Sequence, residues 1–211
     1  MNWKRIVIYI CGVLTLGLGL VLSSKAGIGM SPIMSVPYTL SVFTNFTFGT
    51  WTTIVYCIFT IVEMIEMRRF DIRVILQLPF SWLFGKLVDF YNLIIPIKDP
   101  SLPIAIVIFL LSVVCIALGV VMMLSMDLIV NPADGFVSSM SRIFHTDFGK
   151  AKMCTDFCMA LTTVILLVFF VHHLEGIGIG TLIAVFAVGP ACSFFTNMIG
   201  KKLKQIAGME N

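Results

Sequence analysis

The sequence contains one stretch twice, and this repeat decides the expected fold. The first copy reads Leu18-Gly19-Leu20, then Lys25-Ala26-Gly27-Ile28-Gly29 and Ser31-Pro32, with Phe48-Gly49 after it. The second copy reads Leu118-Gly119-Val120, then Asn131-Pro132-Ala133-Asp134-Gly135, with Phe148-Gly149 after it. Gly19 and Gly119, Pro32 and Pro132, and the two Phe-Gly pairs are all 100 positions apart. We therefore expect an internal duplication, with repeat 1 in residues 1–100 and repeat 2 in residues 101–211.

Composition indicates the class of protein. The 211 residues are 59% hydrophobic and 12% charged, and the mean hydropathy is +1.04. Soluble domains are about a quarter charged, so this chain lacks the polar surface that a water-facing globule needs. A membrane-spanning helix takes roughly 20 residues. We predict an all-α integral membrane protein with six transmembrane helices, in the apolar runs at about 6–22, 52–65, 74–97, 104–126, 157–171 and 176–199.

Several other classes of function find no support in the residues. The net charge is +3, but the basic residues sit at helix ends, where they read as topology signals rather than as a nucleic-acid surface. The six cysteines lie in apolar runs, as small buried hydrophobic residues do, and no histidine accompanies Cys154 and Cys158. No nucleophile elbow, phosphate loop or HExxH motif occurs. We expect no enzyme, no metal or other cofactor, and no nucleic-acid partner.

Two short segments, 32–45 and 132–145, decide the topology. Each has about 14 residues, too few to span the hydrocarbon, and each begins with a proline that suits the first turn of a helix. If both are re-entrant, eleven Lys and Arg residues face the cytoplasm and two face outside; if both span, the split is nine to four. The positive-inside rule favours the re-entrant arrangement. We expect both termini in the cytoplasm.

Three full spans per repeat make the two repeats face opposite ways across the membrane. The predicted fold is therefore two inverted three-helix repeats, each with a short re-entrant or broken helix. Broken helices at matching positions of inverted repeats indicate a binding site near the middle of a transporter. The helix starts at Pro32 and Pro132 would direct unpaired N–H groups and a positive dipole end towards that site.

The repeat residues also carry a resemblance to a known family. The chain resembles the YitT/YczE group of bacterial multi-pass membrane proteins in four features. They are Ala26-Gly27-Ile28-Gly29 before Ser31-Pro32, the related Asn131-Pro132-Ala133-Asp134-Gly135, Gly178-Ile179-Gly180-Thr181 leading to Val188-Gly189-Pro190, and the pair Gly85 and Asp89. The resemblance implies a fold and a plasma-membrane location but no activity. The first copy departs from the pattern, because Ile33-Met34 stands where Ala133-Asp134 supplies an acid.

The candidate substrate-binding residues are polar, charged or helix-starting residues within apolar surroundings. They are Ser31, Pro32, Ser35, Lys86, Asp89, Asn131, Pro132, Asp134, Gly135, Ser138 and Asp156. The serines could bond a solute or a neighbouring helix.

Each ionisable candidate has two possible roles. Lys86 and Asp89 are either a functional pair or a neutral structural pair. Asp134 either caps its own helix or couples transport to a proton or a sodium ion. Asp156 follows Lys152 by four residues, which predicts an interfacial salt bridge or part of a site.

Two further groups are expected at the surface. Glu63 and Glu66 precede Arg68 and are expected at the cytoplasmic surface. His172 and His173 with Glu175 predict a solvated outer loop.

The function expected from these features is secondary transport or channelling of a small polar or anionic solute across the bacterial plasma membrane. Two alternatives stay open: a substrate-binding membrane subunit of a multi-component importer, and a membrane assembly protein that transports nothing. The expected partners are the lipid bilayer, an unidentified small solute, and a second copy or an importer complex.

Overall fold

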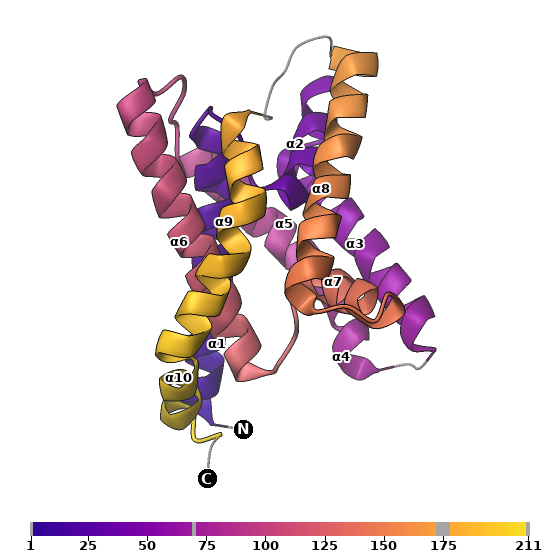
Figure 1. The fold of residues 1–211 in the computed structure, drawn as a ribbon, viewed down its shortest axis with the longest axis vertical. Coiled ribbons are helices and arrows are strands. Elements are labelled where there is room, and N and C mark those ends of the chain that lie inside the picture. The colour runs from indigo at the N-terminus through magenta and orange to yellow at the C-terminus, as the bar shows by residue number, and fades with distance from the viewer. Residues whose placement is uncertain (1, 69–70, 172–177, 210–211) are drawn as a thin grey trace.

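A computed structural model describes residues 2–68, 71–171 and 178–209, and these residues form a helical bundle (Figure 1). Both chain ends lie at the same end of the bundle, here called the termini end, and the opposite end is called the far end. The elements in order are α1 (Trp3–Lys25), α2 (Pro32–Phe43), α3 (Phe48–Met67), α4 (Ile72–Ile75), α5 (Gln77–Ile94), α6 (Leu102–Met126), α7 (Pro132–Ile143), α8 (Phe148–Leu166), the π-helical turn η1 (Leu167–Val171), α9 (Ile179–Phe195), the π-helical turn η2 (Thr196–Gly200) and α10 (Lys201–Ile206). His172, His173 and Glu175 lie outside the described residues.

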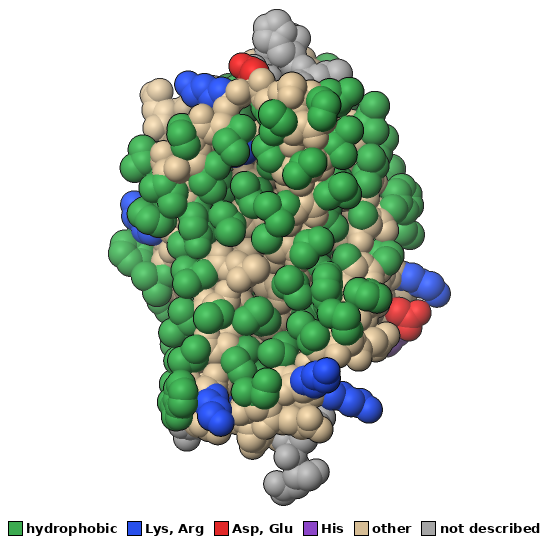
Figure 2. All heavy atoms as spheres, turned by 90° about the vertical axis from the view of Figure 1, so that its left-hand side faces the viewer, with side chains coloured by type: hydrophobic (Ala, Val, Ile, Leu, Met, Phe, Trp, Pro, Cys, Tyr) green, Lys and Arg blue, Asp and Glu red, His purple; other side chains and the backbone are tan. Residues whose placement is uncertain are grey.

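Five segments of the described chain are long and apolar enough to cross a membrane. They are α1, α3, α6, α8 continued through η1 to Phe170, and Ile179–Ile206. Figure 2 shows that hydrophobic side chains cover most of one face, with Lys and Arg around its rim and several of them at the lower end. The chain is thus an all-helical membrane protein. The predicted span 74–97 contains α5, which has 18 residues and carries Gln77, Lys86 and Asp89. By length and composition α5 is not among the five, so the sixth span stays a prediction.

Helices α1 and α6 pack against each other in antiparallel directions along much of their length. At the termini end, the Arg5 side chain donates hydrogen bonds to the carbonyl oxygens of Met126 (2.6 Å) and Asp127 (2.7 Å). Further along, glycines bring the two backbones together, because small residues let membrane helices approach closely. A Cβ added to Gly119 would lie 2.6 Å from the backbone nitrogen of Leu16, and one added to Gly19 would lie 2.7 Å from that of Ile116.

The short helices α2 and α7 start at the predicted prolines, Pro32 and Pro132. Both end two residues before the predicted boundary. The break before α2 is fixed against the start of α9, since the N–H of Gly180 donates to the Ile28 carbonyl at 2.8 Å. Gly29 has a φ of +130° in this break, and a side chain there would overlap Thr181. A glycine is therefore required at that position.

Each short helix packs between the two long helices α3 and α8. The Ser35 hydroxyl on α2 lies 2.7 Å from the Thr163 hydroxyl on α8. On the other side, a Cβ added to Gly135 of α7 would meet the Glu63 carboxyl of α3. Ser35 and Gly135 are 100 positions apart, and so are Glu63 and Thr163. The contact of α2 with α8 and the contact of α7 with α3 are therefore made by equivalent positions of the two repeats.

Candidate functional site

A buried ion pair lies on α8. Lys152 and Asp156 are four residues apart, so they share one face of the helix, and Lys152 Nζ lies 3.5 Å from Asp156 Oδ2. The side chains are only 11% and 4% exposed. The ion pair predicted from the spacing is present, and both side chains are buried between helices rather than exposed to water, while their interfacial depth stays a prediction. Charges at membrane depth are costly unless they are paired, so this pair marks a candidate site.

Helix α7 adds a second carboxylate to the ion pair. Asp134 is 4% exposed, and its carboxyl lies near enough to both Lys152 and Asp156 for their charges to interact. The hydrogen bond that Asp134 accepts comes from the Asn131 side chain at 3.5 Å. That donor is a side chain rather than a backbone N–H of α7, which is not the pattern of a helix cap. We call Asp134, Lys152 and Asp156 the charge cluster.

Two acceptors beside the charge cluster have no hydrogen-bond partner. They are Asn131 Oδ1 and Asp156 Oδ1, and both are fully buried. More than about 90% of buried polar atoms in proteins have a partner, so each unpartnered atom requires a reason. From neighbouring helices, Tyr56 of α3 and Cys192 of α9 face the same cluster.

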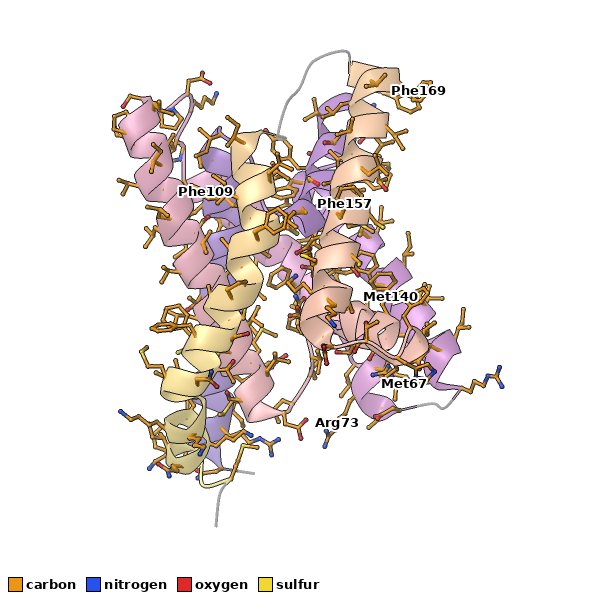
Figure 3. The ribbon with its side chains drawn as sticks, in the orientation of Figure 1. Met67, Arg73, Phe109, Met140, Phe157 and Phe169 are labelled. Atoms are coloured by element: carbon orange, nitrogen blue, oxygen red, sulfur yellow. The ribbon has the colours of Figure 1, made fainter. Side chains whose placement is uncertain are left out.

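A cavity of about 490 Å³ lies between α6, α8 and α9 and reaches the charge cluster through Lys152. Its polar lining comes from Asp147, Lys152, Ser193, Thr196 and Asn197. Figure 3 places Arg73 at the termini end and Phe169, at the end of α8, at the far end. The cavity is lined by the first turns of α8 and by the last turns of α6 and α9, so it lies in the half of the bundle nearer the termini end (Figure 1). A smaller, largely apolar cavity of about 220 Å³ between α7 and α8 touches no member of the cluster.

The two repeats differ at the start of their third helix. In repeat 1, α3 and α5 are in tight contact, and a Cβ on Gly49 would collide with the Gly85 carbonyl oxygen. The Asp89 carboxylate caps α3, since it accepts the Gly49 N–H and the Thr47 hydroxyl, both at 2.8 Å.

In repeat 2 the matching glycines are Gly149, 100 positions after Gly49, and Gly189, which corresponds to Gly85 when four residues are inserted before the last helix, and they stand apart. A Cβ on Gly149 or Gly189 would meet nothing within 4 Å, and both glycines line the large cavity. Ser193 stands at the position of Asp89, and Asp147 makes no side-chain cap at the start of α8.

The structure brings together some of the predicted site residues. Asn131, Pro132, Asp134, Gly135 and Asp156 lie buried at or beside the charge cluster. Ser31, Pro32 and Ser35 are buried at the start of α2, where Ser35 bonds Thr163, and Ser138 donates to the Asp134 carbonyl oxygen of its own helix.

The predicted pair on α5 lies elsewhere. Lys86 is exposed, and with Asp89 it lines a small cavity of about 140 Å³ between α3 and α5. Within the described residues the two side chains form no ion pair.

Sequence reasoning missed three buried polar groups. Lys152 was expected at the interface, Tyr56 was not singled out, and Glu63 was expected at the surface. Glu63 is instead 6% exposed and accepts a 2.9 Å hydrogen bond from Gln77, whereas its neighbour Glu66 pairs with Arg142. The repeat register could have indicated Tyr56, because it occupies the position of Asp156 in the other repeat.

A family model described as "Family of unknown function (DUF6198)" matches residues 3–197. The chain belongs to the DUF6198 family. The match covers nearly all of repeat 1, repeat 2 as far as Asn197, and every residue of the charge cluster. No curated protein matches the chain, and no solved structure does. The DUF6198 description does not mention the YitT/YczE group, so that resemblance stays a prediction.

Proposed function

We propose that this DUF6198 protein is a secondary transporter of a small anionic solute, built from two inverted repeats that close in turn. Inversion is supported by the antiparallel packing of α1 on α6 and by the reciprocal contacts of α2 with α8 and α7 with α3. It is also supported by equivalent glycine contacts, Gly119 on Leu16 and Gly19 on Ile116.

The observation that carries the proposal is the difference between the two repeats. The α3–α5 contact is closed at Gly49 and Gly85, while the matching α8–α9 contact is open at Gly149 and Gly189. A transporter built from two similar repeats alternates between two conformations, and the repeats exchange their structures at each change. In either conformation the two repeats therefore differ in structure although their sequences are similar. In the other conformation, α8 closes on α9 and α3 separates from α5.

The distribution of Lys and Arg indicates which side of the membrane the cavity faces. Arg5, Arg73 and Lys201 belong to the termini end, whereas Lys25 and Lys98 belong to the far end. The positive-inside rule then places the termini end in the cytoplasm. In the conformation described, the cavity between α8 and α9 faces the cytoplasm.

The chemistry of the cavity favours an anion. In the closed repeat the Asp89 carboxylate accepts hydrogen bonds at the start of α3, whereas at the start of α8 the N-cap residue Asp147 makes no side-chain cap and pairs with Lys150 at 3.5 Å. A helix start attracts negative charge, and Lys152 adds a buried ammonium group. The volume of about 490 Å³ suits a small molecule, since ligand pockets run from about 300 to 1,000 Å³.

Counterflow in proteoliposomes tests the proposed function. Vesicles are loaded with inorganic phosphate, acetate, lactate, succinate or citrate in turn, and uptake of the same labelled anion is followed. We expect protein-dependent exchange of at least one anion, abolished by Lys152→Gln. Lys150→Gln is the matched control, because Lys150 lies on the same helix with its side chain 73% exposed. No exchange with any of these anions would contradict the proposal, and stable co-purification with an ATPase would favour an importer subunit instead.

A further inference from the structure

We propose that the charge cluster binds one proton, shared by Asp134 and Asp156, and that this proton is coupled to the anion bound at Lys152. The proposal rests on the proposed function and names the ion that drives it. The site of a coupling ion must match the charge and the size of that ion, and it must be accessible from the solute cavity. The charge cluster has all three properties.

The charges of the cluster do not balance. Two carboxylates face one ammonium group, and each of the three residues is at most 9% exposed. The other groups that face the cluster are Tyr56 from α3, Asn131 from α7 and Cys192 from α9, and none of them is a cation. One negative charge is therefore left without a partner inside the bundle, which is strongly unfavourable. A single bound cation removes this cost.

The unpartnered acceptors indicate how large that cation is. Asn131 Oδ1 and Asp156 Oδ1 are fully enclosed, so a hydrated ion has no route to them. Within the described residues, no three acidic, histidine or cysteine side chains converge as metal ligands do. A proton needs one acceptor and no added volume. It also turns a carboxylate oxygen into a donor, which gives a buried acceptor a partner.

Lys152 couples the proton to the solute. Its ammonium group lines the cavity and lies 3.5 Å from Asp156. The proton comes from a hydronium ion of the cavity water, whose O–H bond breaks as a new O–H bond forms on a carboxylate of the cluster. The protonated cluster then holds one carboxylate and one ammonium group, so an anion that enters the cavity meets no excess negative charge and binds at Lys152 more tightly. Two carboxylates this close titrate as a pair, so the proton belongs to both. The expected ratio is one proton for each monovalent anion.

Infrared difference spectroscopy tests the proton site without any transported solute. The purified full-length protein in lipid nanodiscs is titrated between acid and alkaline pH, and the C=O band of protonated carboxyl groups is followed. We expect a band from a buried carboxyl group that shifts when the protein contains isotopically labelled aspartate. Asp134→Asn and Asp156→Asn should each remove or displace it. Asp99→Asn, in an exposed loop, should leave it unchanged.

Each other result overturns the inference. A band that does not move with labelled aspartate assigns the proton to Glu63, the remaining buried acid among the described residues, and this readout needs no variant to fold. Thermal stabilisation of the wild-type protein by sodium chloride but not by choline chloride would identify a sodium site. Anion exchange can be present or absent in either case, so failure of the proton site is distinguishable from failure of the proposed function.

Discussion

Lys152 Nζ lies 3.5 Å from Asp156 Oδ2 inside the bundle, and Asp134 approaches the same ammonium group from α7. The lysine therefore serves two carboxylates. Removing the lysine leaves both carboxylates unpaired, whereas removing one carboxylate leaves the lysine with the other.

This arrangement predicts unequal costs for single substitutions. Lys152→Met should lower the free energy of unfolding by about 3–5 kcal/mol, the usual cost of an orphaned buried charge. Asp156→Asn should cost less, because Asp134 still neutralises Lys152, and the double variant should recover most of the loss. Unfolding in mixed micelles, followed by fluorescence, measures all three. Equal losses for the two single variants would show that Asp134 does not share the lysine.

The caps of α3 and α8 give a second prediction. Asp147→Thr with Ser193→Asp places at the start of α8 the side chains that Thr47 and Asp89 supply at the start of α3. The new carboxylate should cap α8 and close the cavity, so we expect slower thiol labelling of Cys192, which lines it. Labelling is measured with a membrane-impermeant reagent in a variant that retains only this cysteine. Asp147→Thr alone is the control and should label as the parent does.

The crossing of α1 and α6 gives a third prediction. Gly19→Leu and Gly119→Leu should each destabilise the protein by at least about 1–3 kcal/mol, because each new side chain meets backbone atoms that cannot move away. The two losses should be alike, since the contacts are equivalent. Gly149→Ala faces open space and should change stability by no more than about 0.5 kcal/mol. A neutral Gly119→Leu in the same unfolding assay would be inconsistent with this packing.

Local signals predicted the elements that glycine and proline determine. Pro32 and Pro132 start the short helices as expected. Gly29 lies in the break before α2, where the backbone takes a positive φ that glycine adopts readily. These features depend on a few neighbouring residues, so the sequence is enough to place them. The pairing of Lys152 with Asp156 was accessible for the same reason, because it depends only on helical spacing.

Burial of the charges could not be predicted in the same way. Whether the polar face of α8 meets α7 or lipid depends on how distant helices pack, and the same holds for Glu63 and Gln77 between α3 and α5. Asp89 was interpreted as a partner of Lys86 one turn away, but it caps α3, which is forty residues earlier in the chain. Tertiary contacts of this kind leave no periodic signal in the sequence.

The most direct measurement of alternating closure compares labelling of Cys192 in the parent and in Gly85→Leu. A leucine at position 85 would collide with α3 only in the closed arrangement of repeat 1. A penalty of about 1–3 kcal/mol on one conformation shifts the population roughly 5- to 150-fold. The cavity between α8 and α9 should then close, and labelling of Cys192 from the termini side should slow by a factor in that range. Gly17→Ala, which meets only the side chains of Leu87 and Tyr91 at 3.0–3.4 Å, should label as the parent does. A folded Gly85→Leu variant that labels at the parent rate would contradict alternating closure of the two repeats.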